Sequence, residues 1–408
     1  MSIVRGAKRG AILFVSLAAL TAACKRPGSA ESQPAAAAEE TLTIGGIMPL
    51  SGPLSTVGQS WTRGWELYWE KVNSDGGIKV GGKTYKVNFV AADSKFDAEA
   101  AANSAKKLIY KDGAKFVFGE ITNAAAASIQ AVSTKAQVLN VVPWIAIPNA
   151  EGDVSASKPY VVRPFISSTD SLQMDYDYLR QEWPTVKKVA VVSWLGNEPV
   201  LERAVAVAKK NGYDVVAKDS YAMNSQDFTP FFTKVLASKP EAIHLHSSPI
   251  SGFLLRSIRQ LGFKGPVFSD SPLDPNVIKM TAGDASSFDV FCNGMDPMSP
   301  TPAMQEVVDR WKKKYGDQFV TDSWLAWDTA WVLHQAIMKA GTVDPKEVGA
   351  AFEAMTAPGQ VKTVFGDGMM AGKDVFGVNR VLAKPIPISR ISKTGEIKLV
   401  KLSLPKNG

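Results

Sequence analysis

Cysteine and histidine are scarce in this sequence of 408 residues, which holds two cysteines and three histidines. Two cysteines exclude a framework of several disulfides and a zinc site made of cysteines. With so few cysteines and histidines, the sequence offers almost no residues from which a catalytic triad could be built. A Gly-x-Ser-x-Gly elbow, a phosphate-binding Gly-Lys-Ser/Thr loop and a Gly-x-Gly-x-x-Gly fingerprint are all missing. We therefore expect a protein that is not an enzyme and that holds neither a metal nor a cofactor.

Long apolar runs are scarce too, and the one that stands out lies at the N-terminus. Residues 11–20 form an almost wholly apolar segment that follows three bases and no acid. A helix of ten residues is about 15 Å long, roughly half of a bilayer core, so the segment does not span a membrane. Small residues 21–23 follow it. This pattern is typical of a secretory signal, and we expect residues 1–23 to be a signal peptide.

The end of this signal resembles the lipobox of bacterial lipoproteins, in which small residues precede a cysteine that becomes lipidated. Here that cysteine is Cys24, although Thr21 stands where the pattern prefers leucine. Cleavage at the same bond by an ordinary signal peptidase is the alternative. Residues 24–40 are rich in Pro, Ala, Ser and Glu, which predicts a disordered tether. Cys292, in an apolar run, is expected to be a small buried strand residue.

An excess of one charge is also missing. The formal charge is +7, but without the three bases of residues 1–23 the chain has 43 bases against 39 acids. So small a surplus argues against a nucleic-acid partner and against a basic face that binds membranes.

Strand-like and helix-like segments alternate along the rest of the chain, which predicts parallel sheets flanked by helices. The alternation runs once over residues 41–143 and again over residues 188–269, so we expect two α/β lobes. The expected strands are 41–47, 85–91, 115–119, 138–143, 188–194, 214–221, 242–246 and 267–269. The expected helices are 64–74, 98–111, 124–135, 200–211, 228–238, 252–261, 302–315 and 322–340.

Two further patterns concern the core and the turns. Trp324, Trp327 and Trp331 share one helix face, which is typical of a core stripe. Residues 73–78 form a helix stop whose two glycines can adopt positive φ. The break between the two lobes is expected near residues 160–168.

Ligand crevices of parallel sheets lie beyond the carboxyl ends of the strands. That rule selects the loops in which we expect the binding residues. They are residues 49–59, 120–123, 143–148, 194–198, 246–249 and 270–275.

Residues 44–59 (IGGIMPLSGPLSTVGQ) resemble the opening strand and loop of the branched-chain amino-acid (leucine-binding) periplasmic proteins of ABC importers. The likeness continues in order through segments such as Asn73–Ile78, Arg163-Pro164 and Trp327-Asp328, and it closes at Phe376–Asn379. It covers about Leu42 to Lys401. These segments, taken together in their order and spacing, identify the family more specifically than any one of them does.

The resemblance implies a two-lobed type I periplasmic binding protein with a hinge of three chain crossings. Those crossings would fall near Arg163, near residues 295–299 and near residues 371–381. One lobe would hold residues 41–163 and 297–375, and the other residues 164–296 and 376–408. It also implies a monomer that delivers a small ligand to ABC permease subunits. With the lipobox at Cys24, we expect this protein to be lipid-anchored in the periplasm or at the cell surface. A lipoprotein that senses a ligand and reports to a membrane receptor would share this fold and remains the alternative.

The residues that bind the amino acid in the relatives differ in this sequence. In the amino-acid-binding relatives, hydroxyl groups and backbone N–H groups hold the ligand carboxylate, and a carboxylate of the second lobe holds the ammonium. Here Asn123, beside Thr122, stands at the first hydroxyl position and Ala146 at the second, with Trp144 in the same loop. The acid position aligns with Ser271, which follows Asp270.

A third strand end, where the relatives carry a tyrosine, has Ser247 or Ser248. Each lost partner leaves a polar group of the ligand unpaired, at a cost of about 1–3 kcal/mol. Trp144 and Trp194 instead offer flat apolar area and an indole N–H. We therefore expect an aromatic or alicyclic carboxylate, or a neutral amide, rather than leucine.

The candidate ligand-binding residues are Ser51, Gln59, Thr122, Asn123, Trp144, Ala146, Trp194, Asn197, Glu198, His246, Ser247, Ser248, Asp270 and Ser271. Glu198 and Asp270 have an alternative role as helix caps or solvent-facing charges. His244 and His246 point the same way on one strand but lack a third metal ligand. We expect a buried, hydrogen-bonded His244 and a His246 that faces the ligand.

Overall fold

Two large sheets and a small one organise the chain. The computed structural model describes residues 39–144, 146, 153–246, 250–272, 283, 289–293, 300–392 and 394–403, without the side chains of residues 270–272, 397 and 401–403. The first sheet has six strands in the order β2-β3-β1-β4-β5-β6. Its strands are β1 (Glu39–Met48), β2 (Ile78–Val80), β3 (Lys83–Asp93), β4 (Phe116–Phe118), β5 (Leu139–Val141) and β6 (Val161–Val162). All neighbours pair in parallel except β2 and β3.

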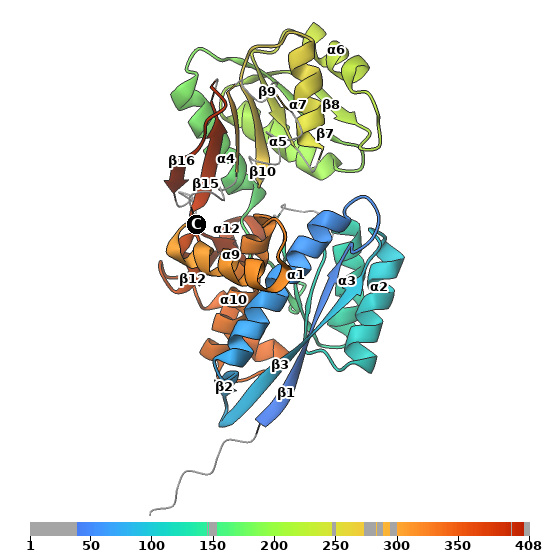
Figure 1. Cartoon of the computed structure of the whole chain (residues 1–408), viewed down its shortest axis with the longest axis vertical. Helices are drawn as coiled ribbons and strands as arrows, with labels where there is room; N and C mark the ends of the chain where they lie inside the picture. The colour runs from blue at the N-terminus through green and yellow to red at the C-terminus, as the bar shows by residue number, and fades with distance from the viewer. Residues whose placement is uncertain are drawn as a thin grey trace, which may run out of the picture. The chain divides into compact units, whose positions relative to one another are not determined.

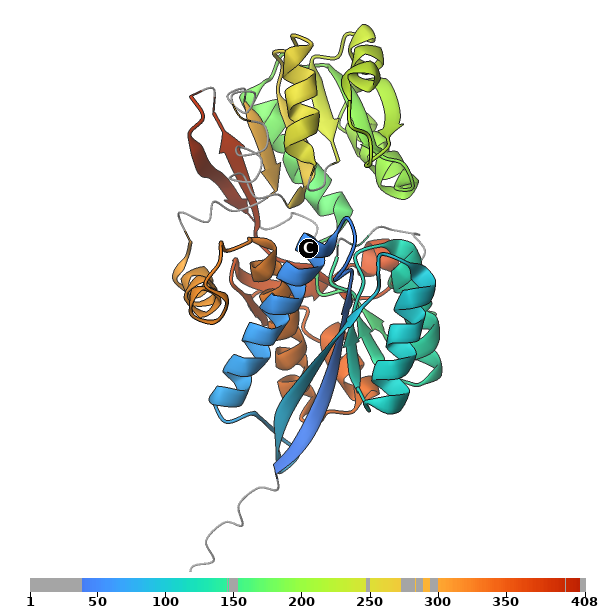
Figure 2. The ribbon, with the colours of Figure 1, turned by 45° about the vertical axis from the view of Figure 1, so that its right-hand side comes forward.

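Helices cover both faces of the first sheet (Figure 1). They are α1 (Ser55–Ser74), α2 (Ala98–Lys106) with the π-helical turn η1 (Lys107–Lys111), α3 (Asn123–Lys135), α9 (Pro302–Tyr315), α10 (Asp322–Ala340) and α11 (Pro345–Glu353). Figure 2 shows α1, in blue, and α2, in cyan, on opposite sides of the long strands. Leu42 and Ile44 of β1 pack in the core with α1 and α10, whereas Ile47 packs in the core with α2 and α3. The alternation of side chains along β1 thus supplies both cores.

The two glycines in the middle of β1 allow close approach of these layers. A Cβ on Gly45 would lie 2.8 Å from a side-chain carbon of Leu108, and one on Gly46 would lie 2.5 Å from the ring of Phe89. Larger residues here would therefore push the layers apart.

The second sheet has seven strands in the order β16-β15-β11-β10-β9-β7-β8. The strands are β7 (Lys188–Trp194), β8 (Asp214–Tyr221), β9 (Ala242–Leu245), β10 (Val267–Pro272), β11 (Val290–Asn293), β15 (Ile386–Ile391) and β16 (Ile397–Ser403). The first five of these pair in parallel, and β15 and β16 are antiparallel to their neighbours. Its helices are α4 (Ser168–Glu182), α5 (Glu198–Lys210), α6 (Thr229–Ala237) and α7 (Ser251–Gln260). Val189 and Val191 pack with α4 and α5, and Ala190 and Val192 with α6 and α7.

The predicted α/β alternation is confirmed, and β7, β8, α9 and α10 have the predicted bounds. Trp324 and Trp327 are buried, as is Cys292 in β11. The predicted glycine stop after α1 is also confirmed, since Gly76 and Gly77 have φ of 103° and 86°.

Two expected helix bounds were wrong, and one helix was missed. The helix expected at residues 64–74 begins at Ser55, and the one expected over residues 98–111 becomes a π-helical turn after Lys106. The chain does leave the first sheet within the break expected near residues 160–168, but the pattern did not predict α4, which begins at Ser168. The buried face of α4 includes Ser168, Ser171 and Asp175 among its apolar residues, so polar positions interrupt the apolar stripe that marks a helix.

The chain passes between the two large sheets after β6 and again after β14 (Val381–Ala383). β14 belongs to the small sheet with β12 (Val361–Thr363) and β13 (Gly366–Ala371), and it lies just after α12 (Lys373–Phe376). The two crossings run side by side, since Arg163 N donates to Arg380 O at 2.9 Å and Leu382 N to Phe165 O at 3.0 Å. The second of them reaches the seven-stranded sheet through Lys384 and Pro385, just beyond the expected range of 371–381. The crossing expected near residues 295–299 lies outside the described residues.

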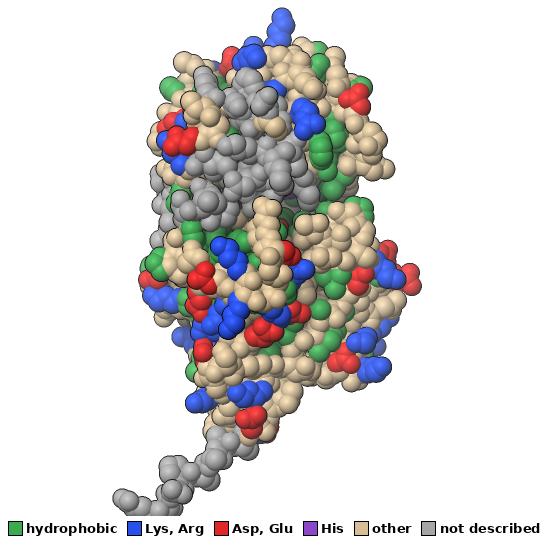
Figure 3. Space-filling model, in the orientation of Figure 1, with side chains coloured by type: hydrophobic (Ala, Val, Ile, Leu, Met, Phe, Trp, Pro, Cys, Tyr) green, Lys and Arg blue, Asp and Glu red, His purple; other side chains and the backbone are tan. Residues whose placement is uncertain are grey.

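Charges on the described surface are mixed in sign. Figure 3 shows basic and acidic side chains interspersed over α1 and α9. Lys314, for example, contacts Glu66 at 3.1 Å and Glu70 at 2.5 Å. Within the described part of the chain, no helix is both long and apolar enough to cross a membrane.

A buried ion pair fixes the second crossing segment. Lys384 Nζ lies 2.6 Å from Asp328 Oδ2, and both side chains are almost wholly buried. Val364 N donates to the other carboxylate oxygen at 2.7 Å. Burial raises the pKa of Asp328 and lowers the pKa of Lys384, and the contact between them opposes both shifts.

Removal of one partner of this pair should be costly. We expect Lys384→Met to lower the free energy of unfolding by about 3–5 kcal/mol, because Asp328 would keep a buried, unpaired charge. The double variant Asp328→Asn/Lys384→Met should recover most of it, since asparagine still accepts from Val364 N. Urea unfolding measures the free energy of unfolding of both variants.

The control is Lys362→Met, whose partner Asp367 is exposed. It should cost less than about 1 kcal/mol. Equal losses at Lys384 and Lys362 would contradict the role given to burial.

Candidate functional site

The parallel pairing of β1, β3, β4 and β5 places the carboxyl ends of these strands along one edge of the first sheet. Four connections leave that edge. They carry Ser51 after β1, Asp93 and Ser94 at the end of β3, residues 120–123 after β4 and Trp144 after β5. Side chains from segments far apart in sequence are thus brought to one place.

Asp93 ties the first two of these connections together. Its carboxylate accepts hydrogen bonds from Leu50 N at 2.8 Å, Ser51 Oγ at 2.6 Å and Lys95 N at 2.7 Å. Burial alone would raise the pKa of Asp93, but these hydrogen bonds outweigh it and lower the pKa below its usual 3.8. Asp93 is therefore an anion at neutral pH.

Glu120 is the most deeply buried charged group at this edge, with 1% of its surface exposed. It accepts hydrogen bonds from Ser94 Oγ at 2.7 Å, Thr122 N at 2.9 Å and Thr122 Oγ1 at 3.0 Å. Burial raises the pKa of Glu120 above its ordinary 4.5, and the hydrogen bonds offset part of that rise. Asn140 of β5 supports the same turn by donating to Gly119 O at 3.1 Å.

The N-terminus of α3 follows Glu120 directly. Thr122 is the N-cap residue, and its hydroxyl accepts from Ala125 N at 3.4 Å. Asn123 begins the helix and is half-buried, and its side chain makes no hydrogen bond with the described residues. Its amide is therefore free to donate to a ligand or to accept from one.

Trp144 is held by aromatic contacts and by its carbonyl. Its ring is stacked on Phe165 with 5.9 Å between centroids and meets Trp61 edge-on at 6.1 Å. Its carbonyl accepts from Arg163 Nη1 at 3.3 Å, and Arg163 Nε lies 3.3 Å from the buried carboxylate of Asp153. Trp144 therefore presents a flat apolar ring that is fixed from behind.

Two other predicted residues of the first sheet lie apart from this cluster. Ala146 is completely buried in an apolar core with Val142 and Val161, and its backbone bonds to Ile166 and Ser168. Its methyl group thus packs inside the protein. Gln59 is exposed on α1.

The second sheet brings Trp194 and His246 together at the ends of β7 and β9. Their ring centroids lie 4.8 Å apart, and His246 is buried. Asn197 is buried and donates to Ser193 Oγ at 3.1 Å, so its amide nitrogen is partly used within the protein. Glu198 is exposed and accepts from Gly196 N at 3.0 Å, at the start of α5. Glu198 therefore fits the alternative given for it above, a solvent-facing charge at a helix terminus.

Four predicted residues have no described side chain. Ser247 and Ser248 lie outside the described residues, and Asp270 and Ser271 are described only as part of β10. Cys24 also lies outside them. His244 is buried, as predicted, with Nδ1 3.0 Å from the hydroxyl of Tyr176. Among the residues that the structure describes, no three His, Cys, Asp or Glu side chains come together as a metal site.

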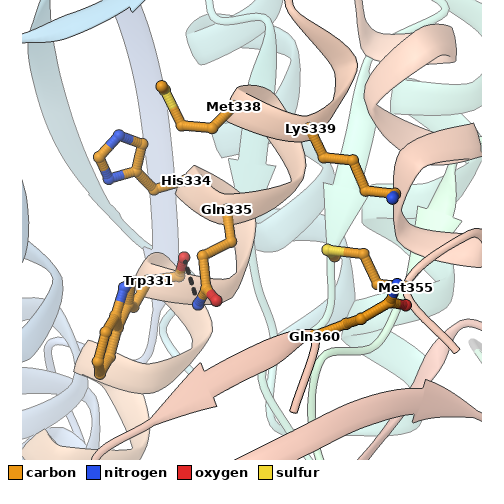
Figure 4. A pocket seen from close by; sticks show the side chains of 7 residues that line it. All are labelled: Trp331, His334, Gln335, Met338, Lys339, Met355 and Gln360. Atoms are coloured by element: carbon orange, nitrogen blue, oxygen red, sulfur yellow. Dashed lines mark hydrogen bonds between the residues drawn. The ribbon is translucent and has the colours of Figure 1, made fainter. Parts of the chain in front are cut away.

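A separate hollow of about 420 Å³ lies along α10 (Figure 4). Its lining residues are Trp331, His334, Gln335, Met338, Lys339, Met355 and Gln360. The amide of Gln335 is already bonded to the backbone of Lys362 in both directions, at 2.9 and 2.8 Å. Because the hollow lies on a helix rather than at the strand ends, we do not assign it to the ligand.

The lowered pKa of His334, which lines this hollow, predicts that the stability of the protein depends on pH. Burial, with a smaller effect of Lys71, lowers its pKa from 6.5 to about 4. As pH falls from 6.5 to 4, the unfolded chain takes up the proton first, so the free energy of unfolding falls. The loss is on the order of 2 kcal/mol, allowing for the partly exposed ring.

The variant His334→Asn should flatten this dependence, since asparagine can still accept from the hydroxyl of Tyr68, which lies 2.8 Å from His334 Nδ1. Urea unfolding of both proteins between pH 7 and 4 measures the difference. Parallel curves would show that His334 does not carry the effect.

Asp93, Ser94 and Glu120 are site residues that the sequence analysis did not single out. Strand β3 runs two residues beyond the expected end at Ala91, so its terminal loop was not among those selected. Glu120 lay inside a selected loop. Its burial against Ser94 depends on the pairing of β1 with both β3 and β4, which the sequence alone did not reveal.

A family model described as periplasmic binding protein matches residues 41–395. The chain therefore belongs to the periplasmic binding protein family, whose members are binding proteins rather than enzymes. Its fold is the type I fold of that family, as the resemblance implied.

The relatives by sequence include "Leu/Ile/Val-binding protein homolog 3" of Brucella melitensis. It is 26% identical over 76% of this chain and 82% of its own length. Among solved structures, the leucine binding protein LivK of Thermotoga maritima superposes with a TM-score of 0.73 at 19% identity, covering 90% of this chain and all of the other. A solute binding protein of R. palustris in complex with 4-hydroxybenzoate gives 0.71 at 20% identity, over 90% and 96%.

Proposed function

We propose that this protein is an extracytoplasmic solute-binding protein that delivers a small organic ligand to the permease of an ABC importer. The observation that carries the proposal is the set of strand-end groups on the first sheet. Trp144, Asn123 and the Asp93–Ser51 pair come from four separate connections to one edge. Such convergence of one flat aromatic ring with a few polar groups is typical of a small-molecule site.

The ligand class that we propose is an apolar or aromatic carboxylate or amide. Trp144 supplies flat apolar area, and Trp194 with His246 supplies a second aromatic pair at the other sheet. Ala146 offers no hydroxyl and is buried. The similar proteins are described as binding branched-chain amino acids in some cases and 4-hydroxybenzoate in another, and the aromatic groups here favour the second kind.

Binding would proceed by hinge closure, without chemistry. The lobes that we propose are residues 41–163 with 297–375, and residues 164–296 with β15 and β16. A ligand with higher affinity for the closed arrangement would shift the population towards it. The paired crossings at residues 163–165 and 380–382 would flex during that change.

The anchor belongs to the same proposal. Lipidation of Cys24 would hold the protein at a membrane surface, with residues 25–40 as the tether. Delivery to a permease at that surface needs no stronger attachment, because the tether keeps the local concentration high.

A calorimetric screen of wild-type protein tests the ligand class. We expect 4-hydroxybenzoate or a similar aromatic acid to bind more tightly than leucine. Trp144→Ala should weaken aromatic binding by about 10- to 100-fold, since it removes the flat contact area.

The control is Trp331→Ala, in the hollow along α10, which should leave binding within about twofold, and thermal unfolding verifies that both variants fold. Micromolar binding of leucine with no response to aromatic acids would overturn the ligand class. A screen in which no small molecule binds would overturn the proposed function.

A further inference from the structure

The hollow along α10 brings together side chains that bind soft metal ions. Its lining includes one histidine, His334, and two methionines, Met338 of α10 and Met355 just after α11. Thioether sulfur is a soft ligand that suits monovalent copper, and imidazole binds copper too. Acidic side chains and cysteines are absent from the described lining of the hollow. The set therefore favours a soft ion of single charge, because no anion in it balances a divalent ion such as Zn²⁺ or Ca²⁺.

The spacing on α10 makes His334 and Met338 neighbours. Side chains four residues apart on a helix share one face, with about 5–6 Å between their Cβ atoms. Figure 4 shows the side chain of Met338 on the same side of α10 as the ring of His334. Pairs of histidines at this spacing hold one metal ion between them. A histidine and a methionine so placed can do the same.

One ring nitrogen of His334 is engaged, and the other is available. Nδ1 lies 2.8 Å from the hydroxyl of Tyr68, whose oxygen can accept the Nδ1 proton. Nε2 has no hydrogen-bond partner among the residues that the structure describes, and the residue is only partly buried. With Nδ1 protonated, Nε2 keeps its lone pair. Histidines that bind metals are usually oriented by such a bond from the second nitrogen.

The two methionines reach the hollow from different elements. Met338 is 48% exposed and Met355 is 2% exposed. Methionine has three rotatable side-chain bonds, so each sulfur can adjust its position. Trp331, one turn before His334, lines the same hollow, and its half-buried ring can face a cation. Lys339 is exposed, and its flexible stem lets the ammonium group turn to water.

We propose that His334 Nε2 and Met338 Sδ, with Met355 Sδ as a third ligand, bind a soft monovalent metal ion, Cu⁺ or its analogue Ag⁺. The ion is bound without a change of oxidation state. Because the hollow lies on α10 and not at the strand ends, this site is separate from the one proposed for the organic ligand. The two proposals therefore stand or fall independently.

Titration of the full chain with Cu⁺, in competition with a chromophoric chelator and under reducing conditions, tests the site. We expect wild-type protein to bind one ion more than the double variant His334→Asn/Met338→Leu, and Zn²⁺ to show no such difference. Ag⁺ should raise the midpoint of thermal unfolding of the wild type but not of the double variant. Tyr68→Phe removes the bond that orients His334 and should weaken Cu⁺ binding by about tenfold.

Met304→Leu is the matched control. It removes a thioether from the core of the first sheet, away from the hollow, and should leave Cu⁺ affinity within about twofold. Cys24 and Cys292 are present in all these proteins, so any Cu⁺ bound by thiols cancels in the comparison. Met338 is half-exposed, so Met338→Leu alone provides the test if the double variant does not fold. It should weaken Cu⁺ binding by at least about tenfold.

Equal Cu⁺ stoichiometry in the wild type and in the folded double variant would overturn the proposal. A loss in Met304→Leu as large as that in Met338→Leu would also overturn it, because the effect would then not belong to the hollow. A difference for Zn²⁺ as large as that for Cu⁺ would contradict the choice of a soft monovalent ion.

Discussion

The parallel pairing of β1 with β3 and β4 is the constraint on which the candidate site depends. Parallel strands must return through helices, so their carboxyl ends gather at one edge and their loops meet there. The glycines in the middle of β1 keep α1 and the η1 turn close enough to hold that edge in place. The site is therefore built from short connections on a rigid base.

Buried ion pairs lie at the crossings between the two large sheets. Arg163 and Lys384 each lie on a crossing segment, and each contacts a buried carboxylate, Asp153 and Asp328 respectively. Such pairs contribute little net stability but penalise alternative arrangements of the chain. Because a buried charge requires its partner at one position, each pair fixes the crossing segment at one place in the sequence. An apolar contact would tolerate a shift of the segment more easily.

The sequence was most informative where buried residues recurred over many positions. The strand over residues 188–194 and the helices over residues 302–315 and 322–340 could be predicted to the residue. The first of these helices buries a regular stripe, and the strand and the second helix are buried over most of their length. α4 could not, since Ser171 and Asp175 interrupt its buried apolar face, where both accept hydrogen bonds from Asn293 of β11. The strand-end loops could be selected in advance. The contact of Glu120 with Ser94 could not, because it joins two connections that meet only in the folded sheet.

The residues of the crossings and those of the strand ends meet at Trp144, whose carbonyl accepts from Arg163 and whose ring stacks on Phe165. The hydrogen bonds of residues 93–94 and 120–123 described above join strand-end residues to one another instead. Substitutions at residues 93–94 or 120–123 can therefore alter the cargo while the crossings keep their contacts. A gene duplicate of such a protein could acquire a new nutrient in a few mutational steps, which makes this architecture well suited to diversification.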